Sequence, residues 1–181
     1  MRYAGFWPRL GAILVDLVVL APFIALSYWS MLTRTTALLA EVPLTLFFAF
    51  YNIYFVGRWG QTIGKMALGI KVVNLDGTNA GFVRAFYRHS VDLGFSIATA
   101  TLNIYALASI SSAEFDSLSF QGRMQLLGEH TPSWNELVNV LTLAWGASEL
   151  IVLLLNTKRR ALHDFIAGTV VIHRGEMVAE A

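Results

Sequence analysis

The sequence contains no cysteine, only four prolines and few charged residues. Without a thiol, the protein has no disulfide bond, no thiolate nucleophile and no cysteine-ligated zinc. Charged side chains make up 14% of the 181 residues, whereas a soluble domain has about 25%. A net charge of +1 gives no general attraction for nucleic acid. Hydrophobic residues reach 56%, which is typical of an integral membrane protein.

Four apolar runs are long enough to cross a membrane as helices, each of which needs about 20 residues. Lipid offers no hydrogen-bond partner to an open strand edge, so every span is expected to be helical. We therefore predict an all-α polytopic protein whose residues 1–181 form a single membrane domain. The predicted spans are about 10–29, 37–56, 91–112 and 137–155, with cytoplasmic segments at 57–90 and 156–181.

The basic residues predict the orientation of these spans. If the N-terminus is cytoplasmic, 11 of the 13 lysines and arginines lie inside, and only Arg34 and Arg123 lie outside. Because cytoplasmic loops carry the excess of Lys and Arg, we expect both termini to be cytoplasmic. Four spans make a thin bundle, so we also expect contact with membrane lipid and a homo-oligomer.

The segments between the spans contain further signals. "IKVVNLDG" alternates and ends on Asp-Gly, and "TVVIHRG" is a second strand candidate, so the two predict a small cytoplasmic β-ribbon. Each half of the chain has two spans, a basic piece that predicts a short amphipathic helix, and a strand. This order suggests a weak internal repeat. Within the outer segment 113–133, "SLSFQGRMQLLG" is compatible with either a short amphipathic helix or a solvated loop.

Carboxylates within the spans are the main functional candidates, because a charge in lipid is costly unless it is paired. Asp16 and Glu149 each lie roughly 10 Å from the cytoplasmic end of their spans. Asn52 and Asp92 also lie in the inner half. Burial and like charge both raise a carboxyl pKa, so converging carboxylates can exchange a proton for a cation. These four residues form the predicted proton or cation site.

Structural pairing explains some of the same residues equally well. Arg9 lies two turns before Asp16 on the same helix face, and Arg88 precedes Asp92 by four residues. Either pair could be a bridge that fixes helix packing. Glu149 favours transport slightly, since its own span contains no basic residue.

Several familiar motifs are absent. "GRWGQTIGK" is not a phosphate loop, because Trp59 stands where the first glycine is needed and Met66 where Ser or Thr is needed. Its glycines are better explained by close helix packing, and Lys65 by contact with lipid phosphates. No nucleophile and base can be paired, so we expect neither an enzyme nor a cofactor.

The C-terminal histidines give little support for a metal site. His163-Asp164 and His173 lack the spacing of known ligand pairs, so we predict no bound metal. Asp164 either forms an ion pair with the basic run 158–160 or caps the helix that begins there.

Three separated blocks resemble the RDD family of bacterial membrane proteins, which is named for one arginine and two aspartates. "GFWPRLGAILVDLVVL" supplies Arg9 and Asp16, and "LHDFIAGTVVI" supplies Asp164. "GQTIGKMALGIKVVNLDG" resembles the family segment after the second span. The resemblance covers nearly the whole chain and implies a multi-pass protein of the bacterial cytoplasmic (inner) membrane. Its cytoplasmic motif residues are Gly60, Gln61, Thr62, Gly64, Lys65 and His163.

The resemblance implies an unsettled function in which transport is suggested. Some family members are associated with Na⁺/H⁺ antiport, and a related eukaryotic domain serves in assembling a membrane complex. Two hypotheses follow for this chain. It is either a transporter that exchanges H⁺ with a cation such as Na⁺ at the carboxylates, or a non-transporting adaptor that binds a membrane protein or lipid. Glu149 lies outside the named trio, so its role rests on this sequence alone.

Overall fold

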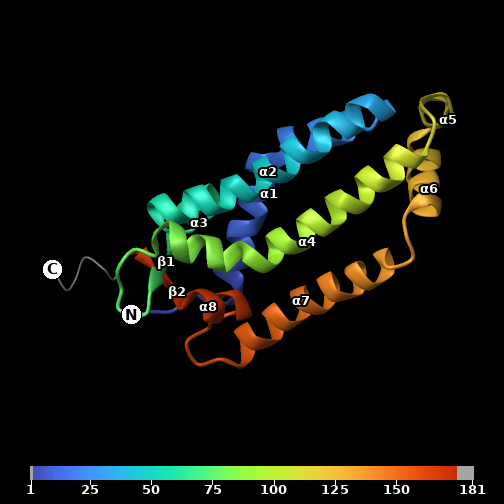
Figure 1. Ribbon diagram of the computed structural model, residues 1–181. Helices are drawn as coiled ribbons and strands as arrows, with labels where there is room; N and C mark the ends of the chain where they lie inside the picture. Colours follow the sequence, from blue (N-terminus) through green and yellow to red (C-terminus); the bar gives the residue numbers. More distant parts are fainter. Residues whose placement is uncertain (1, 175–181) are drawn as a thin grey trace. The chain divides into compact units, whose positions relative to one another are not determined.

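The computed structural model describes residues 2–174 and contains four long helices (Figure 1). All four are long and apolar enough to cross a membrane, which confirms the predicted number of spans. Large apolar side chains on them are exposed, as a lipid-facing surface requires. The long helices are α1 (Phe6–Ser30), α2 (Arg34–Trp59), α4 (Gly81–Ser109) and α7 (Asn135–Leu155).

Helix α4 begins ten residues earlier than the predicted span at 91–112. The preceding turns contain Arg84, Arg88 and His89, so their composition predicted a loop. These turns are helical because two of their polar side chains have partners in the folded protein. The Arg84 guanidinium donates to the carbonyls of Ala167 and Gly168 at 3.1 and 3.0 Å, and Arg88 binds a buried carboxylate.

The predicted ribbon is confirmed as two antiparallel strands, β1 (Ile70–Asn74) and β2 (Thr169–His173). A short helix precedes each strand, α3 (Ile63–Ala67) before β1 and α8 (Leu162–Ala167) before β2. Each short helix is followed by a left-handed glycine, Gly69 with φ 62° and Gly168 with φ 65°. Both halves of the chain therefore end in the same order of helix, glycine and strand.

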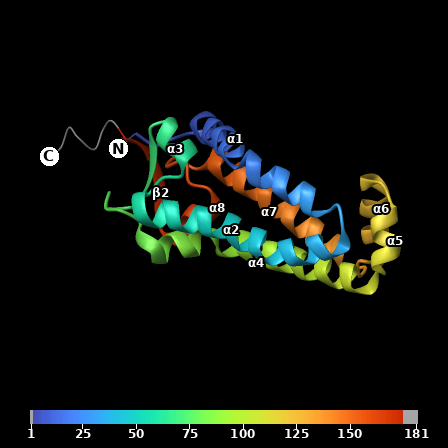
Figure 2. The ribbon, with the colours of Figure 1, turned by 90° about the horizontal axis from the view of Figure 1, so that it is seen from above.

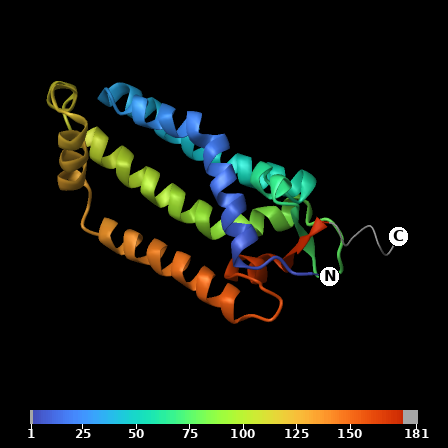
Figure 3. The ribbon, with the colours of Figure 1, turned by 180° about the vertical axis from the view of Figure 1, so that it is seen from behind.

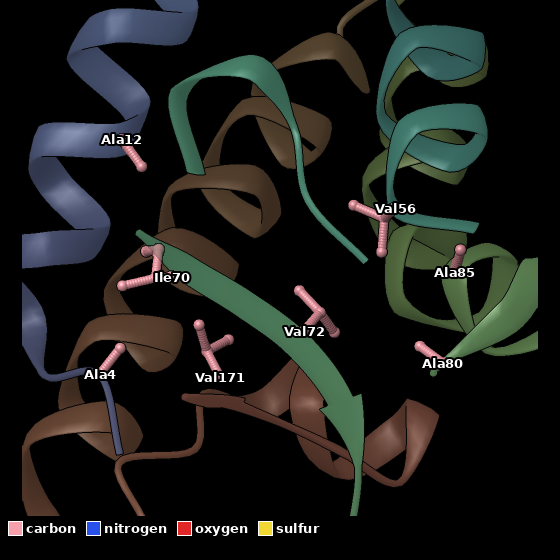
Figure 4. Packing of buried hydrophobic residues seen from close by; sticks show 8 residues of the cluster. All are labelled: Ala4, Ala12, Val56, Ile70, Val72, Ala80, Ala85 and Val171. Carbon is pink, nitrogen blue, oxygen red and sulfur yellow. The ribbon is translucent and has the colours of Figure 1, made fainter. Parts of the chain in front are cut away.

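Contacts divide the described residues into two compact units. Unit 1 comprises residues 1–20, 49–91 and 144–181, of which residue 1 and residues 175–181 lie outside the described residues. Both faces of the ribbon are buried within it. Alternate residues of one face, including Val72 and Val171, pack with Ala12 of α1 and Val56 of α2 (Figure 4). The opposite face is covered by Tyr3.

The N-terminal residues extend this ribbon, an arrangement that the sequence did not predict. The main-chain N–H of Ala4 donates to the carbonyl of Val171 at 2.8 Å, and that of His173 donates to Arg2 at 3.0 Å. Tyr3 forms an antiparallel bridge with Ile172. This pairing covers an edge of β2 that would otherwise expose unpaired backbone groups.

Unit 2 comprises residues 21–48 and 92–143. Its connection between α4 and α7 contains α5 (Ser112–Ser117) and α6 (Phe120–His130), as Figure 3 shows. The helical interpretation of "SLSFQGRMQLLG" is therefore correct. Arg123 of α6 is buried, and its guanidinium donates to the carbonyls of Phe115 at 3.1 Å and Met31 at 3.2 Å.

Candidate functional site

Asp164 is completely buried at the start of α8 and binds two arginines. Its Oδ2 accepts hydrogen bonds from Nη1 of Arg9 at 2.7 Å and from the main-chain N–H of Ala161 at 3.0 Å. Its Oδ1 accepts from Nη1 of Arg88 and from the hydroxyl of Thr169, the latter at 3.2 Å. We call Arg9, Arg88 and Asp164 the Asp164 cluster. It joins α1 and α4 to α8.

The charge of Asp164 is fixed by this environment. Burial raises its pKa, but the Arg88 and Arg9 guanidinium groups outweigh burial and hold the pKa well below the ordinary range. The carboxylate therefore remains ionised at any physiological pH. Such a buried ion pair is stable only because every oxygen has good donors.

The structure shows which predicted partners Asp164 has. The capping prediction is confirmed, because the carboxylate accepts from the N–H of Ala161 at the N-terminus of α8. The ion-pair partners, however, are Arg9 and Arg88 rather than residues 158–160. Arg160 donates instead to the main-chain carbonyl of Asp164 at 2.9 Å. The Arg160 guanidinium also stacks on the Phe165 ring, 4.0 Å from the centroid.

Asp16 has a different set of partners, all within unit 1. Its Oδ1 accepts from the Tyr51 hydroxyl at 2.6 Å and from the N–H of Gly64 at 2.7 Å. Its Oδ2 accepts from the Thr62 hydroxyl at 2.6 Å. Asp16 thereby ties α1 to α2 and α3, and Figure 2 shows α3 beside the first part of α1. The structure pairs Arg9 with Asp164, so the expected Arg9–Asp16 bridge is replaced by these contacts.

The family-like segment "GQTIGK" supplies most of the donors to Asp16. Thr62 is the N-cap of α3, and the Gln61 side chain donates to the Ile70 carbonyl at 2.7 Å. A Cβ at Gly64 would lie 2.0 Å from the Ala12 carbonyl oxygen, so only glycine allows α3 to approach α1 this closely. The expected role of a glycine in close packing is confirmed at this position.

Other residues of the segment complete the turn into β1. Gly60 has φ 72°, a conformation that favours glycine, and its carbonyl accepts from the Val72 N–H at 2.7 Å. Lys65 is partly buried, and its ammonium donates to the Thr62 hydroxyl at 3.3 Å. Burial lowers the pKa of Lys65 to about 8, with a further contribution from the Arg88 charge. Its contact with lipid phosphate stays a prediction.

Glu149 of α7 forms a half-buried pair with His163 of α8. Its Oε1 accepts from the main-chain N–H of His163 at 2.8 Å, and its Oε2 faces His163 Nδ1. The other ring nitrogen, Nε2, lies 3.9 Å from Asp164 Oδ1. Burial and the Arg88 charge lower the pKa of His163, and they outweigh the opposing effects of Glu149 and Asp164. The imidazole is therefore mostly neutral at pH 7.

The Glu149–His163 pair borders a cavity of about 200 Å³. Its walls are mostly apolar side chains of α1 and α7, such as Leu10 and Leu150. Arg9 also borders it, so this small cavity brings one fixed cation together with one carboxylate and one titratable imidazole. Such a combination can hold or release a proton.

The predicted proton or cation residues are thus distributed over several environments. Asp16 and Glu149 have separate partners within unit 1, where Asn52 of α2 is half-buried. Asp92 belongs to unit 2 and borders a different cavity there. Among residues 2–174, no group of three or more His, Asp or Glu side chains is arranged to hold a metal ion.

Sequence reasoning missed two of the most important contributors. The sequence places Arg88 before the third span and offers Asp92 as its partner, whereas the structure pairs it with Asp164. His163 was recognised only as a motif residue, and nothing local indicated that Glu149 would be its partner. Both interactions join residues distant in the sequence, 76 positions apart for Arg88–Asp164 and 14 for Glu149–His163.

Comparison with known proteins assigns a family. The family model described as the RDD family matches residues 3–168. The chain belongs to the RDD family. The predicted resemblance to this family is therefore confirmed. In the structure Arg9 binds Asp164 and Asp16 binds Thr62, so these contacts join α1 to α8 and α3.

Membership of the RDD family and the four long apolar helices of this chain point to a bacterial membrane protein. Over 86 residues the chain is 33% identical to the uncharacterized protein YckC of Bacillus subtilis (strain 168). That match covers 47% of this chain and 56% of the relative, so it spans little more than half of the relative's length. No solved structure matches the chain.

Proposed function

We propose that this RDD protein is a small transporter that exchanges protons for a cation, with Glu149 and His163 as its proton-carrying pair. The observation that supports it is a carboxylate and an imidazole in direct contact beside a cavity within membrane helices. Ionisable groups at such positions are costly and commonly mark ion pathways. The excess of basic residues near the ribbon favours a cytoplasmic orientation for this layer, with both termini inside.

The exchange follows from competition for the Glu149 charge. When His163 is protonated, its imidazolium at Nδ1 neutralises the carboxylate. When the proton leaves Nδ1, the carboxylate charge can instead attract a monovalent cation from the cavity. The Asp164 cluster stays ionised throughout and keeps Arg9 and Asp164 as a fixed frame. Both oxygens of Asp16 already accept hydrogen bonds, from three donors in all, so we assign it a structural role.

Proteoliposome flux tests this proposal. Vesicles containing the purified protein and a trapped pH-sensitive dye receive an inward Na⁺ or K⁺ gradient, and proton movement is followed. Glu149→Gln and His163→Gln should each abolish cation-driven proton movement, whereas the matched control His173→Gln on β2 should not. Unchanged proton movement in both folded variants would refute the exchange mechanism.

A second candidate is a non-transporting adaptor that presents the ribbon layer to another membrane protein. The contacts of Asp16 with Thr62 and Gly64 support it, because this aspartate fastens α3 and therefore the start of β1 to α1. For an adaptor, Asp16→Asn should lower the abundance of an assembled complex. Co-purification in mild detergent would separate the candidates, since an adaptor should retain a stoichiometric protein partner and show no flux.

A further inference from the structure

The cavity that Asp92 borders lies entirely within unit 2. It has a volume of about 470 Å³ and is formed by α1, α2, α4 and α7. Two carboxylates border it, Glu41 of α2 and Asp92 of α4. Among the residues that the structure describes, no lysine, arginine or histidine lines this cavity. Its fixed charge is therefore negative.

Hydroxyl groups on the cavity wall add acceptors rather than donors. Ser27, Ser96 and Thr142 each donate their single hydroxyl proton to a carbonyl of their own helix, at 2.7, 2.8 and 2.8 Å. Ser30 does the same at 2.7 Å. A hydroxyl has one proton and two lone pairs, so each of these oxygens can still accept a hydrogen bond from a ligand. The wall is rich in acceptors and poor in donors.

The remaining surface and the volume restrict the kind of ligand. Phe48, Phe95 and Leu44 provide apolar and aromatic wall, which suits hydrocarbon and can face a cation. The volume falls in the range of about 300–1,000 Å³ that is usual for small-molecule sites. An inorganic cation needs oxygen ligands within about 2.6 Å and would leave most of this space empty.

We propose that the unit 2 cavity binds a small organic ammonium ion, a protonated amine. Its N–H groups donate to the serine and threonine oxygens, and its hydrocarbon part lies against the phenyl rings. Its charge is balanced by the nearer of the two carboxylates, because Glu41 contacts Asn103 and so lies about 16 Å along α4 from Asp92. A diamine can face both carboxylates with its two ammonium groups. The ammonium comes either from a free amine or from the ethanolamine head group of a lipid. The site is independent of the Glu149–His163 exchange, because binding here requires no flux.

Equilibrium binding to the full chain in phosphatidylcholine nanodiscs tests this site. The probes are 2-phenylethylamine and 1,5-diaminopentane, both protonated at pH 7, and the uncharged control is 2-phenylethanol. We expect saturable binding of at least one amine per chain and none of the alcohol. Phosphatidylcholine is a suitable background because its head group has no N–H donor.

The variants separate a built site from an apolar crevice. Glu41→Gln and Asp92→Asn should each weaken binding of 1,5-diaminopentane, which has one ammonium group for each carboxylate, roughly tenfold, the scale of one charged hydrogen bond. Glu136→Gln, an exposed position in the first turn of α7, is the matched control and should bind as the wild type. If Glu41→Gln fails to fold because it contacts Asn103, the exposed Asp92 still provides the test.

Each outcome decides the proposal. No binding of either amine, equal binding of the alcohol, or wild-type affinity in the folded carboxylate variants overturns it. If phosphatidylethanolamine in the nanodisc abolishes amine binding, the ammonium is supplied by the lipid head group. If it has no effect, the ligand is a free amine.

Discussion

Replacing Asp164 with asparagine removes the only carboxylate of the Asp164 cluster while keeping the shape of the side chain. Asparagine still accepts from the N–H of Ala161, so the cap of α8 is largely preserved. The side chains of Arg9 and Arg88 are only 10% and 4% exposed, and both lose their counter-charge. Breaking a buried pair costs about 3–5 kcal/mol, and here two arginines share one partner.

The assay is equilibrium unfolding in mixed micelles by titration with SDS, followed by tryptophan fluorescence. We expect the free energy of unfolding to fall by about 3–5 kcal/mol. Asp76→Asn, an exposed aspartate in the turn after β1, is the control and should change little. Adding Arg88→Gln to the Asp164→Asn variant should restore part of the loss, because one unpaired charge is removed. A loss below about 1 kcal/mol, or strictly additive effects, would contradict the reasoning.

The same variant has a defined pH dependence. Burial raises the pKa of Asp164, but the opposite effect of the Arg88 and Arg9 charges is larger. The folded pKa therefore lies below the unfolded value of about 3.9. Stability from this group is therefore present above that pH and is lost only as the pH falls towards the folded pKa. The difference between wild type and Asp164→Asn should stay constant from about pH 7 to pH 5.

Three further predictions concern the other contacts. Gly64→Ala should destabilise the protein by about 2–3 kcal/mol, because the added Cβ would meet the Ala12 carbonyl oxygen. Gly94→Ala is the control, since a Cβ there has open space. SDS titration measures both variants. Tyr51→Phe removes a donor to the Asp16 carboxylate and should lower the free energy of unfolding by about 1.5–3 kcal/mol in the same assay. Burial lowers the pKa of His163 below 6.5, so the unfolded state binds a proton more readily than the folded state. The free energy of unfolding therefore decreases as the pH is lowered. Thermal melting at about pH 7 and pH 5 should show a smaller acid loss in His163→Gln, and equal losses would contradict this assignment.

The features that could be predicted from the sequence depend on local patterns. Apolar runs indicated the four spans, and alternation in "IKVVNLDG" and "TVVIHRG" indicated the ribbon. The pairing of charges could not be predicted, because Arg9 had Asp16 nearby on its own helix. Its actual partner, Asp164, is 155 positions away, and no periodicity specifies such a contact. The start of α4 could not be predicted for a related reason. A charged residue such as Arg88 is expected at the surface, whereas here it is buried and paired with Asp164, which is distant in the sequence.

The Asp164 cluster also has a consequence for biosynthesis. Arg9 leaves the ribosome first, and at 5–20 residues per second Asp164 follows roughly 8–30 s later. During this interval Arg9 and Arg88 have no carboxylate from α8, so their long side chains must reach water at the membrane surface. The cluster closes only when nearly the whole chain has been translated. A chain truncated before α8 therefore retains two arginines without the carboxylate that pairs with them in the finished protein.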